Sequence, residues 1–254
     1  LIRWDVSGHG ILCVRYSVFF STPQLEQFQI LGVGMNMLPP PQKKKHLIYI
    51  VAAALVCMLL APHAISAGKR TDEPYRPETG DIIGHTSQSG QSDLIKYGTA
   101  SRFTHVGVVV IRDGKPYVAE AVATTRYTPL DEWIVRGEGA QYRIVRYGEG
   151  LEPSQKAAIV DGIDGNLGKR YDPAFQWSDK KMYCSELVWK AYDNAGIRIV
   201  EPRTLKEYPG MGIPRIRKVM DARWGGKLNP DEPVVAPVDV MKGESFVVVD
   251  REGL

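Results

Sequence analysis

The sequence predicts a single domain of the α+β class, in which strands and helices are mixed along the chain. Two β-rich segments, 104–112 and 115–122, flank Asp113-Gly114, and this arrangement is the strongest local signal for a hairpin with a type I′ turn. In 184–196 apolar residues recur with the period of a helix, and the segment ends at a glycine. The other elements alternate irregularly, which is typical of α+β folds.

The remaining elements are predicted from local composition. Thr128 as a cap and Pro129 at the first helical position predict a helix that runs to about Gly137. Residues 171–183 are interpreted as an aromatic loop, and 201–237 as a segment rich in proline, glycine and charge. The other predicted strands lie at 80–83, 141–147 and 246–249, and the other predicted helices at 92–97 and 153–167.

Composition excludes several classes of protein. The 254 residues are 44% hydrophobic and 24% charged, which excludes a disordered or collagen-like chain. The net charge is +3, but five of the 32 Lys and Arg and only two of the 29 Asp and Glu precede Gly68. From Gly68 onward 27 basic residues therefore face 27 acidic ones. No phosphate-binding loop, dinucleotide motif or basic block is found, so we expect no nucleic-acid partner.

The charge excess belongs to a predicted signal peptide at 37–67. Three lysines at 43–45 precede an uncharged apolar stretch of about 14 residues, and small residues lead to predicted cleavage after Ala67, with Ala64 as the alternative. The stretch is shorter than the roughly 20 residues of a membrane-spanning helix. An uncleaved membrane anchor is the alternative interpretation.

The signal peptide also sets the expected domain organisation. Met35 and Met37 are both suitable starts, so 1–36 are interpreted as upstream translation with no domain of their own. Residues 68–254 are expected to form one domain with a core at about 75–200. We expect a periplasmic or secreted protein without a stable membrane span after cleavage; its oligomeric state stays open.

Removing the first 67 residues leaves Cys184 as the only cysteine, and His85 and His105 as the only histidines. This count excludes an internal disulfide and zinc sites of the Cys₄ or Cys₂His₂ kind, and no metal or cofactor is predicted. A lone cysteine is either a small buried residue or a nucleophile. Cys184 begins the predicted helix, where the positive dipole end lowers a thiol pKa and free amides can hold an oxyanion.

The hairpin supplies a partner for Cys184. With a two-residue turn Gly107 faces Glu120 and His105 faces Val122, so His105 and Glu120 are diagonal neighbours about 7–8 Å apart on one face. Gly107 is expected to leave room for the Glu120 side chain. A Cys nucleophile, a His base and a carboxylate that orients the His form a generalised catalytic triad. The alternative interpretation is that His105 has a structural role and that Glu120 is a charged residue at the edge of a sheet.

The sequence resembles the YiiX/YebB-like branch of the permuted papain-like (NlpC/p60) cysteine hydrolases over about residues 75–200. The matching stretches are Thr79-Gly80-Asp81-Ile82-Ile83, Gln88-Ser89, Gln91-Ser92, Thr104-His105-Val106-Gly107, Tyr117-Val118-Ala119-Glu120-Ala121 and Tyr183-Cys184-Ser185-Glu186-Leu187-Val188. The resemblance implies a circularly permuted papain-like fold, with an antiparallel sheet packed against the Cys-bearing helix. It also implies the roles nucleophile, base and orienter for Cys184, His105 and Glu120.

The chain departs from this family at two positions. Phe103 stands where relatives commonly have Tyr, and Gly84-His85 stand where they tend to have Phe-Gln. We expect His85, Phe103 and Tyr183 to contact substrate, with a solvated loop residue as the alternative for His85. We expect these two departures to affect substrate preference more than the catalytic mechanism.

These observations predict an exported cysteine hydrolase that cleaves an amide bond through an acyl-enzyme. The resemblance implies a cell-wall peptide, or an acylated small molecule or lipid, as the substrate. Two alternatives stay open: an acyltransferase on the same fold, and a non-catalytic envelope binding module.

Overall fold

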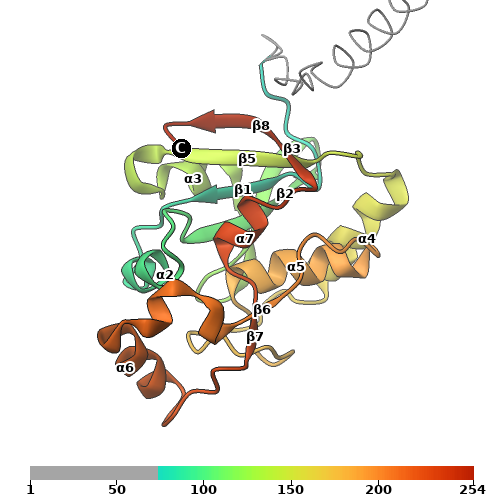
Figure 1. Cartoon of the computed structure of the whole chain (residues 1–254). Coiled ribbons are helices and arrows are strands. Elements are labelled where there is room, and N and C mark those ends of the chain that lie inside the picture. The colour runs from blue at the N-terminus through green and yellow to red at the C-terminus, as the bar shows by residue number, and fades with distance from the viewer. Residues whose placement is uncertain (1–73) are drawn as a thin grey trace, which may run out of the picture. The chain divides into compact units, whose positions relative to one another are not determined.

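A computed structural model describes residues 74–254, which form a six-stranded antiparallel sheet with helices on both faces (Figure 1). The strand order is β4-β3-β2-β1-β5-β8. The sheet strands are β1 (Ile82–His85), β2 (His105–Arg112), β3 (Lys115–Ala121), β4 (Thr125–Pro129), β5 (Tyr142–Tyr147) and β8 (Phe246–Glu252). The α-helices are α2 (Ser92–Thr99), α3 (Leu130–Val135), α4 (Pro153–Asp164), α5 (Cys184–Asn194), α6 (Pro214–Arg223) and α7 (Pro237–Met241). The fold is α+β, as predicted.

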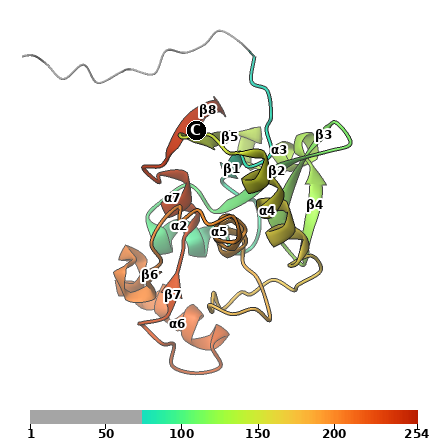
Figure 2. The same cartoon turned by 90° about the vertical axis from the view of Figure 1, so that its right-hand side faces the viewer.

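The shorter elements of the described residues lie mostly after α5. They are the two-stranded sheet of β6 (Arg203–Thr204) and β7 (Pro233–Val234) and the 3₁₀ helices η1 (Glu138–Ala140), η2 (Leu205–Glu207) and η3 (Pro209–Gly212). In Figures 1 and 2 α6, β6 and β7 lie on the far side of α5 and α2 from the six-stranded sheet.

The central hairpin has the predicted register. Arg112 pairs with Lys115 and Val108 with Ala119, and positive φ angles of 50° at Asp113 and 73° at Gly114 are those of a type I′ turn. A Cβ on Gly107 would lie 2.4 Å from Val118 Cγ1 and 2.6 Å from the Ala119 carbonyl oxygen. The close approach of β3 therefore requires this glycine.

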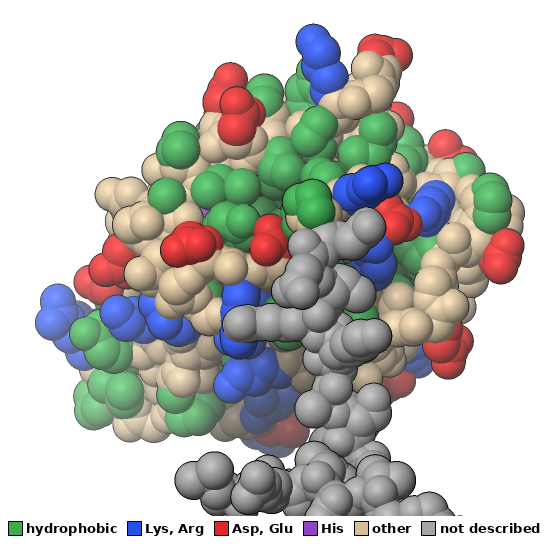
Figure 3. All heavy atoms as spheres, turned by 90° about the horizontal axis from the view of Figure 1, so that it is seen from above, with side chains coloured by type: hydrophobic (Ala, Val, Ile, Leu, Met, Phe, Trp, Pro, Cys, Tyr) green, Lys and Arg blue, Asp and Glu red, His purple; other side chains and the backbone are tan. Residues whose placement is uncertain are grey.

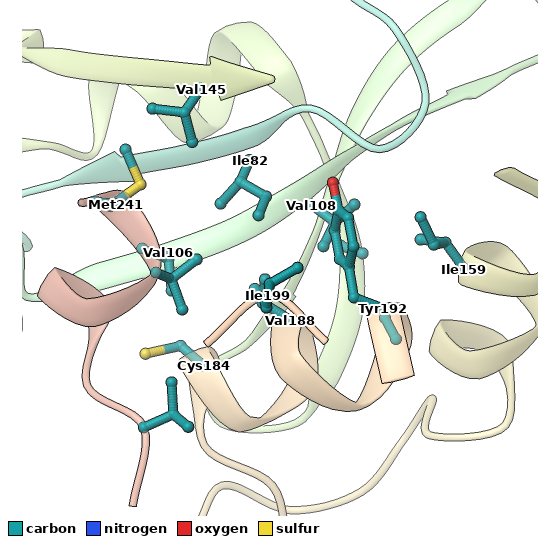
Figure 4. Close-up of a cluster of buried hydrophobic side chains, with 14 of the residues drawn as sticks. Ile82, Val106, Val108, Val145, Ile159, Cys184, Val188, Tyr192, Ile199 and Met241 are labelled. Atoms are coloured by element: carbon teal, nitrogen blue, oxygen red, sulfur yellow. The ribbon is translucent and has the colours of Figure 1, made fainter. Parts of the chain in front are cut away.

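Neighbouring residues of a strand point to opposite faces of the sheet, and both faces are buried by helices. On one face Ile82, Val106 and Val108 pack against α5 in the largest hydrophobic cluster (Figure 4). On the other face Ile83 and Val109 pack against α3 and its Trp133. Burial on both faces accounts for the apolar runs in β1 and β2.

Several elements differ from the sequence expectation. The helix expected from 128 begins at Leu130, because Thr128 and Pro129 belong to β4, a strand the sequence did not predict. Neither η2, η3 nor α6 was predicted in 201–237. The strand predicted at 246–249 is present as β8, which pairs with β5 at one edge of the sheet.

The outer surface of β8 is partly apolar. Val247 and Val248 are about half exposed there, and Figure 3 shows hydrophobic side chains gathered on this side of the molecule. Among residues 74–254 no helix has the length and apolar character needed to cross a membrane. The expected upstream segment 1–36 and signal peptide 37–67 lie outside the described residues.

Candidate active site

Cys184 is the first residue of α5 and is almost fully buried. Figure 4 shows it at the N-terminal end of that helix, below Val106 of β2. The backbone N–H groups of Val106 and Ser185 hydrogen-bond to its sulfur. Amide donors and the positive end of a helix both favour a thiolate over a thiol. Cys184 is the one free cysteine in the described part of the chain.

His105 connects Cys184 to Glu120. The His105 Nε2 atom lies 2.7 Å from Glu120 Oε2, so the predicted contact between these two side chains is confirmed. With Nε2 engaged, Nδ1 is the ring nitrogen left for the hydrogen bond between His105 and the Cys184 thiol.

His105 and Cys184 shift each other's pKa values. Burial disfavours the charged forms of both groups, but their mutual hydrogen bond and opposite charges outweigh it. The pKa of Cys184 is therefore lowered, and the pKa of His105 is raised to about 9, with Glu120 adding to the second effect. Both shifts favour transfer of the Cys184 proton to His105.

Glu120 is completely buried and is held by several donors. Its Oε1 atom accepts hydrogen bonds from Thr128 Oγ1 at 2.7 Å and from Arg136 at 2.6 Å, and Arg126 Nε lies 3.4 Å away. Burial raises the pKa of the Glu120 carboxyl, but the hydrogen bonds and charges of His105 and Arg136 reverse this and hold it well below its usual range. Glu120 is therefore ionised at neutral pH.

His85 lies beside His105 on the same face of the sheet, because the two residues pair across β1 and β2. The His85 ring stacks on Trp133 with 3.8 Å between centroids, and the His105 ring lies 5.7 Å from the same indole. Burial, and then the charges of His105 and Arg136, lower the pKa of His85 to about 3. His85 is thus a neutral buried ring, and its interpretation as a solvated loop residue is wrong.

A cleft of about 480 Å³ with both polar and apolar walls opens beside His105, with His85, Gln88 and Tyr171 in its wall. Tyr171 lies close enough to Cys184 for the sulfur to affect the pKa of its hydroxyl. Burial and the neighbouring sulfur raise the pKa of Tyr171 well above its usual value. A neutral phenol that can donate a hydrogen bond therefore lies next to the thiol.

Tyr183 and Phe103, the other two residues predicted to contact substrate, lie in different surroundings. Tyr183, directly before Cys184, lines a second cavity that is apolar and also reaches Cys184. Phe103 is buried in the cluster between the sheet and α5, with the Arg143 guanidinium 5.1 Å from its ring. Phe103 lines neither cavity, so its observed role is packing.

Sequence reasoning missed Thr128, Arg136 and Tyr171. Arg126 pairs directly with Glu120 across β3 and β4, so recognising β4 as a strand would have placed Arg126 and Thr128 near Glu120. Arg136 and Tyr171 come from the end of α3 and from the loop before α5. No local pattern marks either of them.

The comparisons with known proteins agree with this fold. The family described as "Permuted papain-like amidase enzyme, YaeF/YiiX, C92 family" matches residues 76–242. A curated relative, "Uncharacterized protein YiiX" of Escherichia coli (strain K12), is 40% identical over 179 residues, which are 70% of this chain and 88% of the relative.

A solved structure is similar in the same region. It is titled "Crystal structure of metalloprotein yiiX from Escherichia coli O157:H7", and the match has a TM-score of 0.67 and 40% identity over 70% of this chain and 99% of the other. Within residues 74–254 of the present chain, no group of three or more His, Cys, Asp or Glu side chains is placed to hold a metal ion. The family match, the relative and the shared fold together show that the chain belongs to the permuted papain-like amidase family.

Proposed function

We propose that this protein is an exported cysteine hydrolase that cleaves an amide bond, with Cys184 as nucleophile, His105 as base and Glu120 as the residue that orients His105. The supporting observations are the 2.7 Å contact between His105 Nε2 and Glu120 Oε2 and the opposite pKa shifts that His105 and Cys184 cause in each other. A nucleophile, a base and an orienting carboxylate in mutual contact are the geometric signature of covalent acyl chemistry.

In the proposed reaction His105 takes the Cys184 proton and the thiolate attacks the amide carbonyl carbon. The tetrahedral intermediate breaks its C–N bond as His105 returns the proton to the leaving amine, and a thioester remains on Cys184. His105 then removes a proton from water, whose oxygen attacks the thioester. The carboxylic acid leaves, and Cys184 recovers its proton.

Other side chains have supporting roles in this proposal. The amides at the start of α5 and the neutral Tyr171 hydroxyl are candidates to donate to the oxyanion, because both lie beside the sulfur. His85, kept neutral in the cleft wall, is a candidate to contact the leaving group. Tyr183 contacts the acyl side through the second cavity.

Location and substrate class are also part of the proposal. The basic and apolar pattern of 37–67 supports export to the periplasm or outside the cell, with 68–254 as the mature domain. The volume and mixed lining of the cleft support a peptide or a small acylated amine as substrate, in keeping with an amidase family.

The decisive experiment compares the wild type with Cys184→Ser and His105→Ala. Iodoacetamide alkylation of Cys184, followed by peptide mapping at pH 7, should be fast in the wild type and at least tenfold slower in His105→Ala, because the thiolate is lost. Release of amine from a library of peptides and acyl amides should fall by about 10³-fold or more in Cys184→Ser.

Two results would change the proposal. Amide hydrolysis that survives in Cys184→Ser would refute the nucleophile, and ordinary thiol reactivity without turnover would support a binding module instead. Product analysis with an added amine acceptor separates hydrolysis from acyl transfer, because a transferase forms the new amide in place of the free acid.

A further inference from the structure

Three arginine side chains gather where β5 and β8 form an edge of the sheet (Figure 1). Arg143 of β5 pairs directly with Arg251 of β8, so these two side chains are neighbours on one face. Arg102, in the loop before β2, donates to Gln141 Oε1 at 2.8 Å and to the Gly253 carbonyl at 3.3 Å, and so lies at the same end of the two strands. We call Arg102, Arg143 and Arg251 the arginine cluster. It lines neither the cleft nor the apolar cavity of the candidate active site.

No carboxylate within residues 74–254 forms an ion pair with the arginine cluster. Asp250 and Glu252 flank Arg251 in the sequence, but neighbouring residues of a strand point to opposite faces. Burial, and then the charges of Arg251 and Arg102, lower the pKa of Arg143. The three positive charges therefore repel one another, with no acid between them to offset the repulsion.

Two of the three guanidinium groups are already held in place. Arg102 is fixed by its two hydrogen bonds, and the Arg143 guanidinium lies 5.1 Å from the centroid of the Phe103 ring, whose face attracts a cation. The Arg143 Nε atom is buried and has no hydrogen-bond partner among the described residues. Like charges opposite each other in a sheet and a buried donor without a partner both destabilise a fold. A bound anion offsets the first of these costs.

The charge of the arginine cluster fits a phosphate group better than a carboxylate. A phosphate monoester carries a charge of about −1.5 to −2 at pH 7 and three strong acceptor oxygens, whereas a carboxylate neutralises only one arginine. Guanidinium groups bind phosphate through two parallel N–H donors. Val248 adds an apolar neighbour: it pairs with Val145, on the same face as Arg143 and Arg251, and is about half exposed.

We infer that the arginine cluster is a binding site for a phosphate group, carried by a phospholipid headgroup or by a soluble phosphorylated molecule. The site uses none of the three residues proposed for catalysis. It therefore goes beyond the proposed function and can be tested without any hydrolase activity.

The test measures the Tm of the full chain as sodium phosphate replaces sodium chloride at pH 7.5 and constant ionic strength. Binding to the folded protein raises Tm with ligand concentration, which gives an apparent Kd. Arg251→Gln should raise that Kd by about tenfold, because it removes one charged donor pair. Arg198→Gln is the matched control, since Arg198 is an exposed arginine paired with Glu201 outside the cluster, and should leave the Kd unchanged.

A second variant, Arg143→Gln, should weaken phosphate binding by a similar factor and keeps the test valid if Arg251→Gln fails to fold. Phosphate also stabilises folded proteins in general by exclusion from their surface, but that effect is the same in all variants. An equal rise in Tm in the wild type, Arg251→Gln and Arg143→Gln would therefore overturn the site.

Two further probes distinguish the sources of the phosphate group. They are glycerol 3-phosphate and dihexanoylphosphatidylglycerol, the second used below its critical micelle concentration. Tighter binding of the lipid, with the gain lost in Val248→Ser, would assign the site to a phospholipid headgroup. Equal binding of both probes, unchanged in Val248→Ser but weakened in Arg251→Gln, would assign it to a soluble phosphorylated molecule. Binding of neither probe would overturn the inference.

Discussion

Two glutamates with completely buried side chains support the candidate site, and they are held in different ways. Glu120 supports the His105 side of the site, and Glu186, in the first turn of α5, supports the Cys184 side. Glu186 accepts the backbone N–H groups of Tyr183 and Ser178, both at 3.3 Å, and lies 2.9 Å from Lys190 Nζ. It thereby ties the aromatic loop to the start of the helix.

The two carboxyls have opposite pKa shifts. Burial raises the pKa of Glu186 to about 7, because Lys190 and two long amide contacts compensate only in part. Burial also opposes the charge on Glu120, but the short bonds from His105, Arg136 and Thr128 prevail and lower its pKa. The comparison teaches that the number and quality of donors, rather than burial, decide whether a buried carboxyl stays charged.

The opposite shifts have opposite consequences for stability. Glu120 stabilises the fold above the ordinary glutamate pKa, and this contribution is lost as pH falls through its lower folded value. For Glu186 the folded protein binds the proton more tightly than the unfolded chain. Its contribution to stability therefore falls as pH rises from about 4.5 to about 7.

The largest effect is expected for Glu120→Gln. An amide removes the negative charge beside His105, so the pKa of His105 should fall and its ring should lose orientation, with a loss of about 10²- to 10⁴-fold in kcat/KM. The measurement is the pH profile of kcat/KM together with the alkylation rate of Cys184. Glu186→Gln is the matched control and should change kcat/KM by less than about tenfold, because it touches neither reacting group. Equal losses in both variants would contradict the assignment of Glu120 as the residue that orients His105.

A smaller effect is expected from the arginines around Glu120. Arg136→Met removes a 2.6 Å bond to a buried carboxylate and should lower the free energy of unfolding by about 1.5–3 kcal/mol. Arg126→Met is the control, since Arg126 is about half exposed and lies 3.4 Å away, and it should lower that energy by less than about 1 kcal/mol. Urea unfolding at pH 7 measures the free energy of unfolding of both variants. A larger loss in Arg126→Met than in Arg136→Met would show that Arg126 is the more important partner of Glu120.

The smallest effect is expected for the pH dependence of stability in Glu186→Gln. The wild type should lose stability between pH 5 and pH 7.5 relative to the variant, because glutamine has no proton to release. The pKa shift from about 4.5 to about 7 is worth about 2 kcal/mol over this pH range, which corresponds to a difference in Tm change of about 4–8 °C in a domain of this size. Thermal unfolding of both proteins at the two pH values measures it. Parallel Tm changes would mean that Lys190 keeps Glu186 ionised throughout this range.

The sequence by itself determined the local parts of the site. Asp113-Gly114 specifies a two-residue turn, and the turn sets the register that brings His105 and Glu120 to one face of the sheet. The apolar period of 184–196 places Cys184 at a helix N-terminus. These features depend on backbone geometry over a few residues, which is why composition and spacing were sufficient.

Only the tertiary structure decided what surrounds these three residues. Arg136 and Tyr171 reach Glu120 and Cys184 from segments that local patterns do not connect to them, and Thr128 was mistaken for a helix cap because its strand pairing is not visible in its own neighbourhood. The apolar cavity beside Cys184 likewise forms where α2, η3, α6 and β7 meet. Contacts between distant segments depend on packing of the whole domain, so pKa values and pocket shape follow from the fold and not from the motif.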